Sequence, residues 1–219
     1  MSAMEQADEL IRRIEADVSA RLLSSPACHD WEHTCRVRAN AMRIAQEEGA
    51  DLLVVELAAL LHDIGRPAEL ADCGKTDHAL LGAAMAGAIL RKHGCDEALT
   101  AKVIECVRTH RYRKRGPEGM PASLEAKCVF DADKLDSIGA IGIGRAFHFA
   151  GRTGAKVHNT EQQALASDSY SREDTAYREF LVKLRHIKDN MLTSAGRRMA
   201  HQRHDFMCAF FDELNSELQ

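Results

Sequence analysis

A run of ten residues, Leu52 to Leu61, places the strongest limit on how this chain can fold. The run is apolar on nearly every face of a helix and is interrupted only by Glu56. A helix that is apolar all round is either buried in a protein or crosses a membrane, and ten residues are far fewer than the roughly 18 that a membrane span needs. The run therefore predicts a helix at the centre of a bundle, and His62 and Asp63 end it.

Helix signals also dominate the rest of the 219 residues, which predicts an all-α fold. Good helix formers are abundant, only four prolines occur, and runs of alternating β-branched residues are absent. Capping residues and helix breakers predict a helix that is capped by Asp30 and ends at Gly49. They also predict helices at residues 4–23, 78–93, 96–110, 124–135, 172–190 and 195–218. Polar loops are expected up to residue 75, at 111–121 and at 151–168, the last as a mobile loop or lid. The glycines of residues 138–144 predict tight helix packing, because no strand precedes them as in a phosphate loop.

The charge balance and the cysteines exclude several classes of protein. Lys and Arg number 29 and Asp and Glu 33, so the net charge of -4 gives no overall case for a nucleic-acid partner. The seven cysteines form an odd set without CxxC spacing, and no apolar leader follows Met1, which is typical of a reduced protein of the cytoplasm. We therefore expect a cytoplasmic protein that binds neither nucleic acid nor membrane.

Four residues spread over about a hundred positions, His33, His62, Asp63 and Asp133, are candidate metal ligands. Imidazole and carboxylate together are the ligand set of divalent Mn, Fe, Co, Ni or Zn, and mixed N/O ligation leaves positions open for water. These side chains can meet only if three separate helices converge, which suits an enzyme centre better than a local zinc clip. The pattern predicts a metallohydrolase.

The segments that carry these residues resemble a known signature. Residues 29–37, 60–65 and 130–136 are similar to the H…HD…D motif of the HD-domain phosphohydrolase superfamily. The resemblance implies a helical bundle in which His33, His62, Asp63 and Asp133 bind metal. Residues 180–198 resemble the C-terminal region of a largely uncharacterised bacterial HD subfamily. We expect one HD-type domain over residues 1–219, with a metal-binding core at about 29–150 and a helical extension at about 170–219.

The same resemblance bears on the number of metal ions. Bimetallic HD proteins also carry a histidine that opens the helix after the HD pair and one that ends the following helix, and His78 and His110 stand at these positions. Six ligands exceed the need of one catalytic ion, so Asp63 is expected to bridge two ions about 3.5–4 Å apart. In the alternative, His78 only starts a helix or binds substrate phosphate, and His110 sits favourably at a helix C-terminus. The sequence is therefore compatible with either one or two bound metal ions.

Three cations are candidates to neutralise a bound phosphate. Arg36 lies on the helix face of the first ligand, and Arg66 and Lys134 directly follow ligand motifs. The alternatives are a surface position for Arg36 and structural ion pairs of Arg66 and Lys134 with Asp131 or Asp136.

Two further residue types lie near the ligands in sequence. His29, four residues before His33, is a candidate to orient a ligand or a water without binding metal itself. Cys28 and Cys35 are expected to be small buried hydrophobes, because thiolate ligands usually come in closer or paired spacings.

We hypothesise a phosphohydrolase that uses metal-activated water on a small phosphate ester, with a nucleotide as the expected substrate and Asp63, Arg36, Arg66 and Lys134 as catalytic residues. No Gly-Tyr-Pro triplet follows His110 and no Glu-Asp pair follows the HD residues, which disfavours cyclic-di-GMP and alarmone substrates. Alternatives are a di-iron oxygenase of the same superfamily or a non-catalytic, metal-bearing regulatory module. Apolar residues of the tail are expected to pack on the core or to form a homodimer, namely Phe180, Leu184, Phe206, Phe210 and Phe211.

Overall fold

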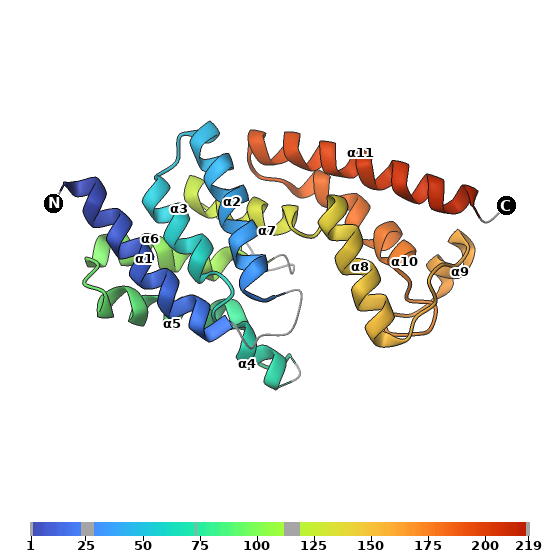
Figure 1. Ribbon diagram of the computed structural model, residues 1–219, viewed down its shortest axis with the longest axis horizontal. Coiled ribbons are helices and arrows are strands. Elements are labelled where there is room, and N and C mark those ends of the chain that lie inside the picture. The colour runs from blue at the N-terminus through green and yellow to red at the C-terminus, as the bar shows by residue number, and fades with distance from the viewer. Residues whose placement is uncertain (1, 23–28, 73, 112–118, 218–219) are drawn as a thin grey trace. The chain divides into compact units, whose positions relative to one another are not determined.

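The computed structural model describes residues 2–22, 29–72, 74–111 and 119–217, and all regular structure in these ranges is helical (Figure 1). This confirms the all-α prediction. The helices are α1 (Ala3–Leu22), α2 (Trp31–Glu48), α3 (Leu52–Leu61), α4 (Arg66–Ala71), α5 (His78–Lys92), α6 (Glu97–Thr109), α7 (Leu124–Leu135), α8 (Gly139–Thr153), α9 (Glu161–Ala166), α10 (Ala176–Val182), the 3-10 helix η2 (Leu184–Asn190) and α11 (Ser194–Ser216). Residues 23–28 and 112–118, which include Cys28 and most of the expected basic loop, lie outside the described residues.

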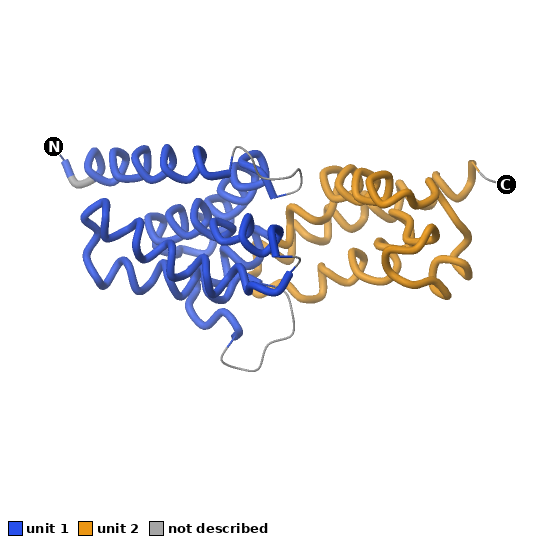
Figure 2. Tube along the Cα trace, turned by 90° about the horizontal axis from the view of Figure 1, so that it is seen from below, with its two compact units in different colours: residues 1–133 blue, residues 134–219 orange. Residues whose placement is uncertain are grey.

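The chain divides into two compact units, residues 1–133 and residues 134–219 (Figure 2). In the first unit, α3 packs against α1, α2 and α6 and is buried along most of its length, with Val54, Val55 and residues 57–61 fully enclosed. The predicted central helix is therefore confirmed. No helix in the described part of the chain is long and apolar enough to cross a membrane. The single-domain interpretation stays a prediction.

Aspartate caps set where four helices of the first unit begin. The side chains of Asp30, Asp51, Asp77 and Asp96 each accept a backbone N–H from the first turn of α2, α3, α5 and α6, respectively. Such a side chain satisfies a donor that the helix itself leaves unpaired. At the other end of α2, Gly49 adopts a left-handed conformation with φ 75°, as expected for a residue that follows a helix.

The second unit has an aromatic core. Phe211 of α11 is 1% exposed and stacks on Phe180 of α10 with a centroid distance of 4.6 Å. Leu184 is also buried, whereas Phe206 is 52% exposed. Part of the apolar tail therefore packs within its own unit, and the homodimer stays a prediction.

Two expectations for this unit were wrong. The helix predicted at 172–190 is broken, because Lys183 leaves helical geometry at φ -141° and ψ -57° and η2 follows it. The loop predicted at 151–168 contains the end of α8 and all of α9, since Thr160 and Gln163 form a reciprocal capping box.

The structure also describes the glycine-rich segment at the start of α8 and the polar segment after Asp63. Residues 139–144 lie in α8, and a Cβ on Gly139 would lie 3.0 Å from the side chain of Arg203 on α11, which is a tight contact between helices. Gly142 is instead required by a local contact, because its Cβ would collide with the carbonyl oxygen of Ser137 in the turn before α8. The loop expected after Asp63 is instead partly helical. Pro67 lies in the first turn of α4, where its missing N–H costs nothing.

Candidate metal centre

The first unit brings the six predicted metal ligands together at the ends of its helices. His78 opens α5, and His33 lies in the first turn of α2. His62 and His110 directly follow α3 and α6. Asp63 lies in the turn after α3, and Asp133 lies near the end of α7. The Asp30 cap accepts the backbone N–H of His33 at 2.9 Å and so fixes the first turn of α2. Aspartate caps therefore fix the starts of the two helices that carry His33 and His78.

One cluster forms around His33. Its Nε2 atom lies 3.2 Å from Nε2 of His62 and 3.5 Å from Oδ1 of Asp133. The Oδ2 atom of Asp63 lies 3.6 Å from the same His33 nitrogen and 3.8 Å from that of His62. Three ligand atoms, from His33, His62 and Asp133, are all within 4.8 Å of one another.

A second cluster forms on the other side of the Asp63 carboxylate. The Nε2 atoms of His78 and His110 lie 3.2 Å apart, and each is 3.5 Å from Oδ1 of Asp63. The two oxygens of Asp63 thus face two different histidine pairs. This arrangement places one histidine pair at each oxygen of Asp63, and Asp133 lies beside the first pair.

Backbone carbonyls set the tautomers of two of these histidines. Nδ1 of His62 donates to the carbonyl of Ala59 at 2.8 Å, and Nδ1 of His110 donates to that of Val107 at 2.7 Å. Each carbonyl belongs to the last turn of the preceding helix, where it has no partner within the helix. With the proton on Nδ1, the neutral ring directs the Nε2 lone pair into the cluster.

Burial and charge favour the protonation states that a metal ion needs. Desolvation lowers the pKa of His62 to about 4, and desolvation with the charge of Arg66 lowers that of His78 to about 2. Burial alone would raise the pKa of Asp63, but the neighbouring histidines and Arg66 hold it well below its usual value. At neutral pH, His62 and His78 are therefore neutral beside an ionised Asp63 carboxylate.

The donor set fits divalent cations. Asp63 is 1% exposed, and its Oδ1 atom makes no hydrogen bond to any described residue, although Nη2 of Arg66 lies 3.3 Å from it. A buried carboxylate oxygen without a donor is costly unless a cation compensates it. The Nε2 atoms of each histidine pair also lie 3.2 Å apart, close enough for both nitrogens to ligate one cation. The residues thus match the nitrogen and oxygen ligation of a transition-metal site.

Comparison with known proteins places this centre in a family. Residues 30–138 match the family model of the HD domain. The chain is also 35% identical to the uncharacterized protein YpgQ of Bacillus subtilis strain 168 over 219 residues, which are 100% of this chain and 96% of YpgQ. The chain belongs to the HD-domain family.

Solved structures agree with this assignment over nearly the whole chain. The crystal structure of Bacillus subtilis YpgQ in complex with ADP matches with a TM-score of 0.74 and 32% identity, covering 97% of this chain and 96% of that one. An HD-superfamily hydrolase from Bacillus thuringiensis matches with a TM-score of 0.74 and 28% identity, covering 97% and 98%. These relatives support a metal-dependent hydrolase.

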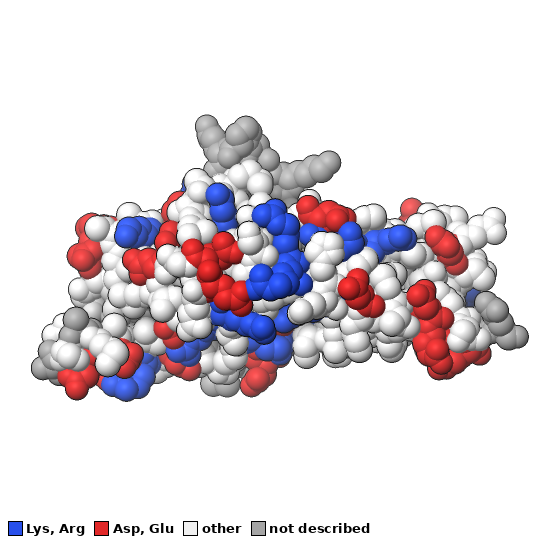
Figure 3. All heavy atoms as spheres, turned by 90° about the horizontal axis from the view of Figure 1, so that it is seen from above, with Lys and Arg blue, Asp and Glu red and all other residues white. Residues whose placement is uncertain are grey.

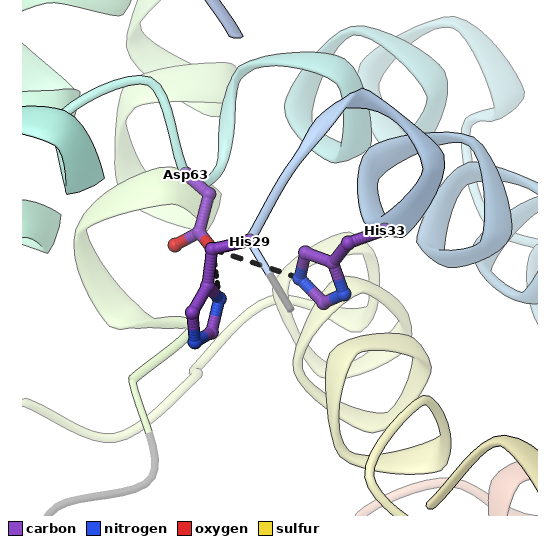
Figure 4. A group of neighbouring side chains, drawn as sticks. All are labelled: His29, His33 and Asp63. Carbon is purple, nitrogen blue, oxygen red and sulfur yellow. Dashed lines mark hydrogen bonds and ion pairs between the residues drawn. The ribbon is translucent and has the colours of Figure 1, made fainter. Parts of the chain in front are cut away.

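His29 and Arg66 both contact the aspartate of the HD pair. Nδ1 of His29 donates to Oδ2 of Asp63 at 3.0 Å, and Figure 4 shows His29 and His33 beside that carboxylate. Arg66 forms ion pairs with Asp63 at 3.3 Å and with Glu69 at 2.7 Å. Its ion pairs therefore involve carboxylates other than the Asp131 and Asp136 considered from sequence. His29 also forms a three-residue ligand group with His33 and Asp63.

The other two predicted catalytic cations are Arg36 and Lys134. Arg36 is half-buried on α2, and its role stays a prediction. Lys134 is buried and follows Asp133 on α7, but the boundary between the compact units falls between these two residues. Asp136 forms its ion pair with Arg145 at 2.6 Å.

Two residues beside the HD centre are not among the site residues that the sequence predicts. Glu69 is buried on α4, and Arg111 directly follows His110 and pairs with Glu69 at 2.7 Å. A signal for α4 was available, because a proline in the first turn and an acidic residue close behind it are typical of a helix N-terminus. No local signal pointed to the pairing of Glu69 with Arg111, since 42 positions separate them.

Proposed function

We propose that this HD-domain protein is a phosphohydrolase that binds one metal ion at each histidine pair and uses Asp63 as the bridge. The observation that supports this most directly is the division of the Asp63 carboxylate: Oδ2 faces His33 and His62, and Oδ1 faces His78 and His110. Asp133 would complete the first site. A shared carboxylate between two such sites is the arrangement of two-metal hydrolases.

Bound ions would lower the pKa of a water molecule and polarise a phosphoryl oxygen. The protein's own residues supply the remaining requirements. The Ala59 and Val107 carbonyls hold two imidazoles in the ligating tautomer, and His29 holds Oδ2 of Asp63. Arg66, 18% exposed in its side chain, would offer guanidinium N–H groups to phosphate oxygens. We assign the same role to Arg36 and Lys134.

The proposed substrate is a nucleotide or another small phosphate ester. The related YpgQ forms a complex with ADP, which supports a nucleotide ligand. The surface drawn in Figure 3 carries acidic and basic side chains next to one another, and the net charge is -4. A compact anion that is held at a buried centre suits these features better than an extended polyanion.

Phosphate release from nucleoside mono-, di- and triphosphates, measured with added Mn²⁺, tests the proposal. The substitution Asp63→Asn should lower kcat/KM by several orders of magnitude, because the bridge between the two sites is lost. Asp17→Asn is the matched control, since Asp17 also pairs with a histidine but lies on α1 and is not among the predicted ligands. A folded Asp63→Asn protein with undiminished turnover would refute the assignment. Turnover that persists without dioxygen and with a redox-inert ion would exclude the oxygenase alternative.

A further inference from the structure

Glu69 is the centre of a buried ionic network beside the second histidine pair. The residue is 6% exposed on α4. Its Oε1 accepts from Nη2 of Arg111 at 2.7 Å, and its Oε2 accepts from Nη1 of Arg66 at 2.7 Å. Oε2 also lies 2.9 Å from Nδ1 of His78. One buried carboxylate thus contacts two guanidinium groups and an imidazole.

The position of His78 explains why it needs a side-chain partner. His62 and His110 follow the ends of their helices, where free carbonyls one turn back accept their Nδ1–H groups. His78 is the first residue of α5, so no helical turn precedes it. A histidine at a helix start must therefore find its acceptor elsewhere in the fold, and Glu69 is within reach.

The Nδ1 atom of His78 is itself an unsatisfied polar atom. It is buried and meets no hydrogen-bond criterion with any described residue, although Glu69 Oε2 is 2.9 Å away. A small turn of the imidazole would align Nδ1–H with this oxygen and keep Nε2 directed at the Asp63 carboxylate. Ligating histidines almost always donate their second ring N–H in this way, and a carboxylate is a common acceptor.

Backbone packing and a second ion pair hold Glu69 against this histidine. A Cβ on Gly65, the residue before α4, would collide with the carbonyl oxygen of His78, so the start of α4 is pressed against the start of α5. Arg111 also pairs with Asp77 at 3.1 Å, and Asp77 caps α5 directly before His78. The network therefore joins the segments that carry both histidines of the second pair.

We infer that Glu69 is a positioning residue for the second metal site, where it fixes the ring of His78 by accepting its Nδ1–H. The inference rests on the two-ion proposal above. It predicts a selective effect: loss of Glu69 weakens the ion held by His78, His110 and Asp63 and spares the ion held by His33, His62 and Asp133.

Calorimetric titration of the chelator-treated full chain with Mn²⁺, combined with elemental analysis, tests the inference without any substrate. The unsubstituted protein should bind two ions. Glu69→Ala should weaken one of them about 10–100-fold and leave the other unchanged, as is typical when the carboxylate partner of a ligating histidine is removed. Glu56→Gln is the matched control, because Glu56 is a half-buried carboxylate that pairs with Arg38 in the same unit. Both ions should bind normally to this variant.

A double substitution identifies which site is affected. His78→Ala should weaken the same ion, and Glu69→Ala combined with His78→Ala should bind no worse than His78→Ala alone, because Glu69 acts through that ring. Where Glu69→Ala does not fold, as judged by circular dichroism, Glu69→Met, which keeps the side-chain volume and removes the carboxylate acceptor, replaces it with the same expectation. Two ions that both bind the folded Glu69 variant with unchanged affinity overturn the role of Glu69. A count of one ion in the unsubstituted protein overturns the two-ion proposal itself, so the two failures are distinguishable.

Discussion

Two glycines that face each other beside the metal centre should respond in opposite ways to the same substitution. Gly65 lies between Asp63 and α4, and Gly82 lies inside α5. A Cβ on Gly65 would lie 2.8 Å from the backbone nitrogen of Gly82 and would collide with the carbonyl oxygen of His78. A Cβ on Gly82 would have its nearest neighbours at 3.5 Å, which is an ordinary van der Waals distance. A methyl group therefore fits at Gly82 but not at Gly65.

The expected magnitudes follow from these distances. Gly65→Ala forces two backbone segments apart and should destabilise the first unit by about 1–3 kcal/mol, the usual cost of overpacking. Gly82→Ala removes a helix-interior glycine without a collision and should stabilise by about 0.5–1 kcal/mol. For a chain of this length, each kcal/mol corresponds to a change of about 2–4 °C in the Tm.

Urea titration followed by circular dichroism at equal protein concentration measures both changes. The chain has two compact units, so the transition must first be checked for two-state behaviour with a second probe. Equal destabilisation by the two substitutions would refute the reasoning, and so would a neutral Gly65→Ala. Because His78 lies at the same contact, Gly65→Ala should also weaken Mn²⁺ binding, whereas Gly82→Ala should not.

Two further predictions concern titratable groups away from the metal centre. Burial raises the pKa of the Cys106 thiol and raises that of the Cys128 thiol to about 12. Both thiols should therefore resist iodoacetamide at pH 8 in the native protein and react after denaturation, which peptide mass spectrometry measures. Rapid labelling of the native protein would contradict their burial. Hydrogen bonds from Lys92 and His93 lower the pKa of Asp17 to about 2, below the value of about 3.9 in an unfolded chain. The contribution of the Asp17 carboxylate to stability should be complete above pH 4 and lost as the pH falls toward 2. Asp17→Asn should remove that part of the pH dependence of the unfolding free energy. An unchanged pH profile would contradict the pairing.

Local sequence signals predicted most of the first unit because its helices begin at their own caps. Asp30, Asp51 and Asp96 each cap the helix that directly follows, and the apolar run after Asp51 needs only a bundle around it to be buried. The helix boundaries of the second unit, residues 134–219, were harder to predict. Lys183 interrupts a continuous amphipathic pattern, and this break is a property of tertiary packing that no cap or proline announces.

The ligand types at the metal centre were also readable from sequence, but the geometry around them was not. Histidine and aspartate at helix ends predicted a shared centre, yet no pattern tells which oxygen of Asp63 faces which histidine pair. The roles of Arg36, Arg66 and Lys134 depend on a bound phosphate and stay predictions.

The position of a ligating histidine along its helix decides what kind of partner can orient it. A histidine just after a helix C-terminus, such as His62 or His110, inherits a free carbonyl from its own last turn, so its support is local and follows from the helix boundary. A histidine that opens a helix, such as His78, has no such carbonyl and depends on a side chain from another element. For this chain that element is α4, which places Glu69 beside a ring nine positions further along the sequence. Where a ligand motif opens a helix, a short helix before it is therefore the segment in which to seek the positioning residue.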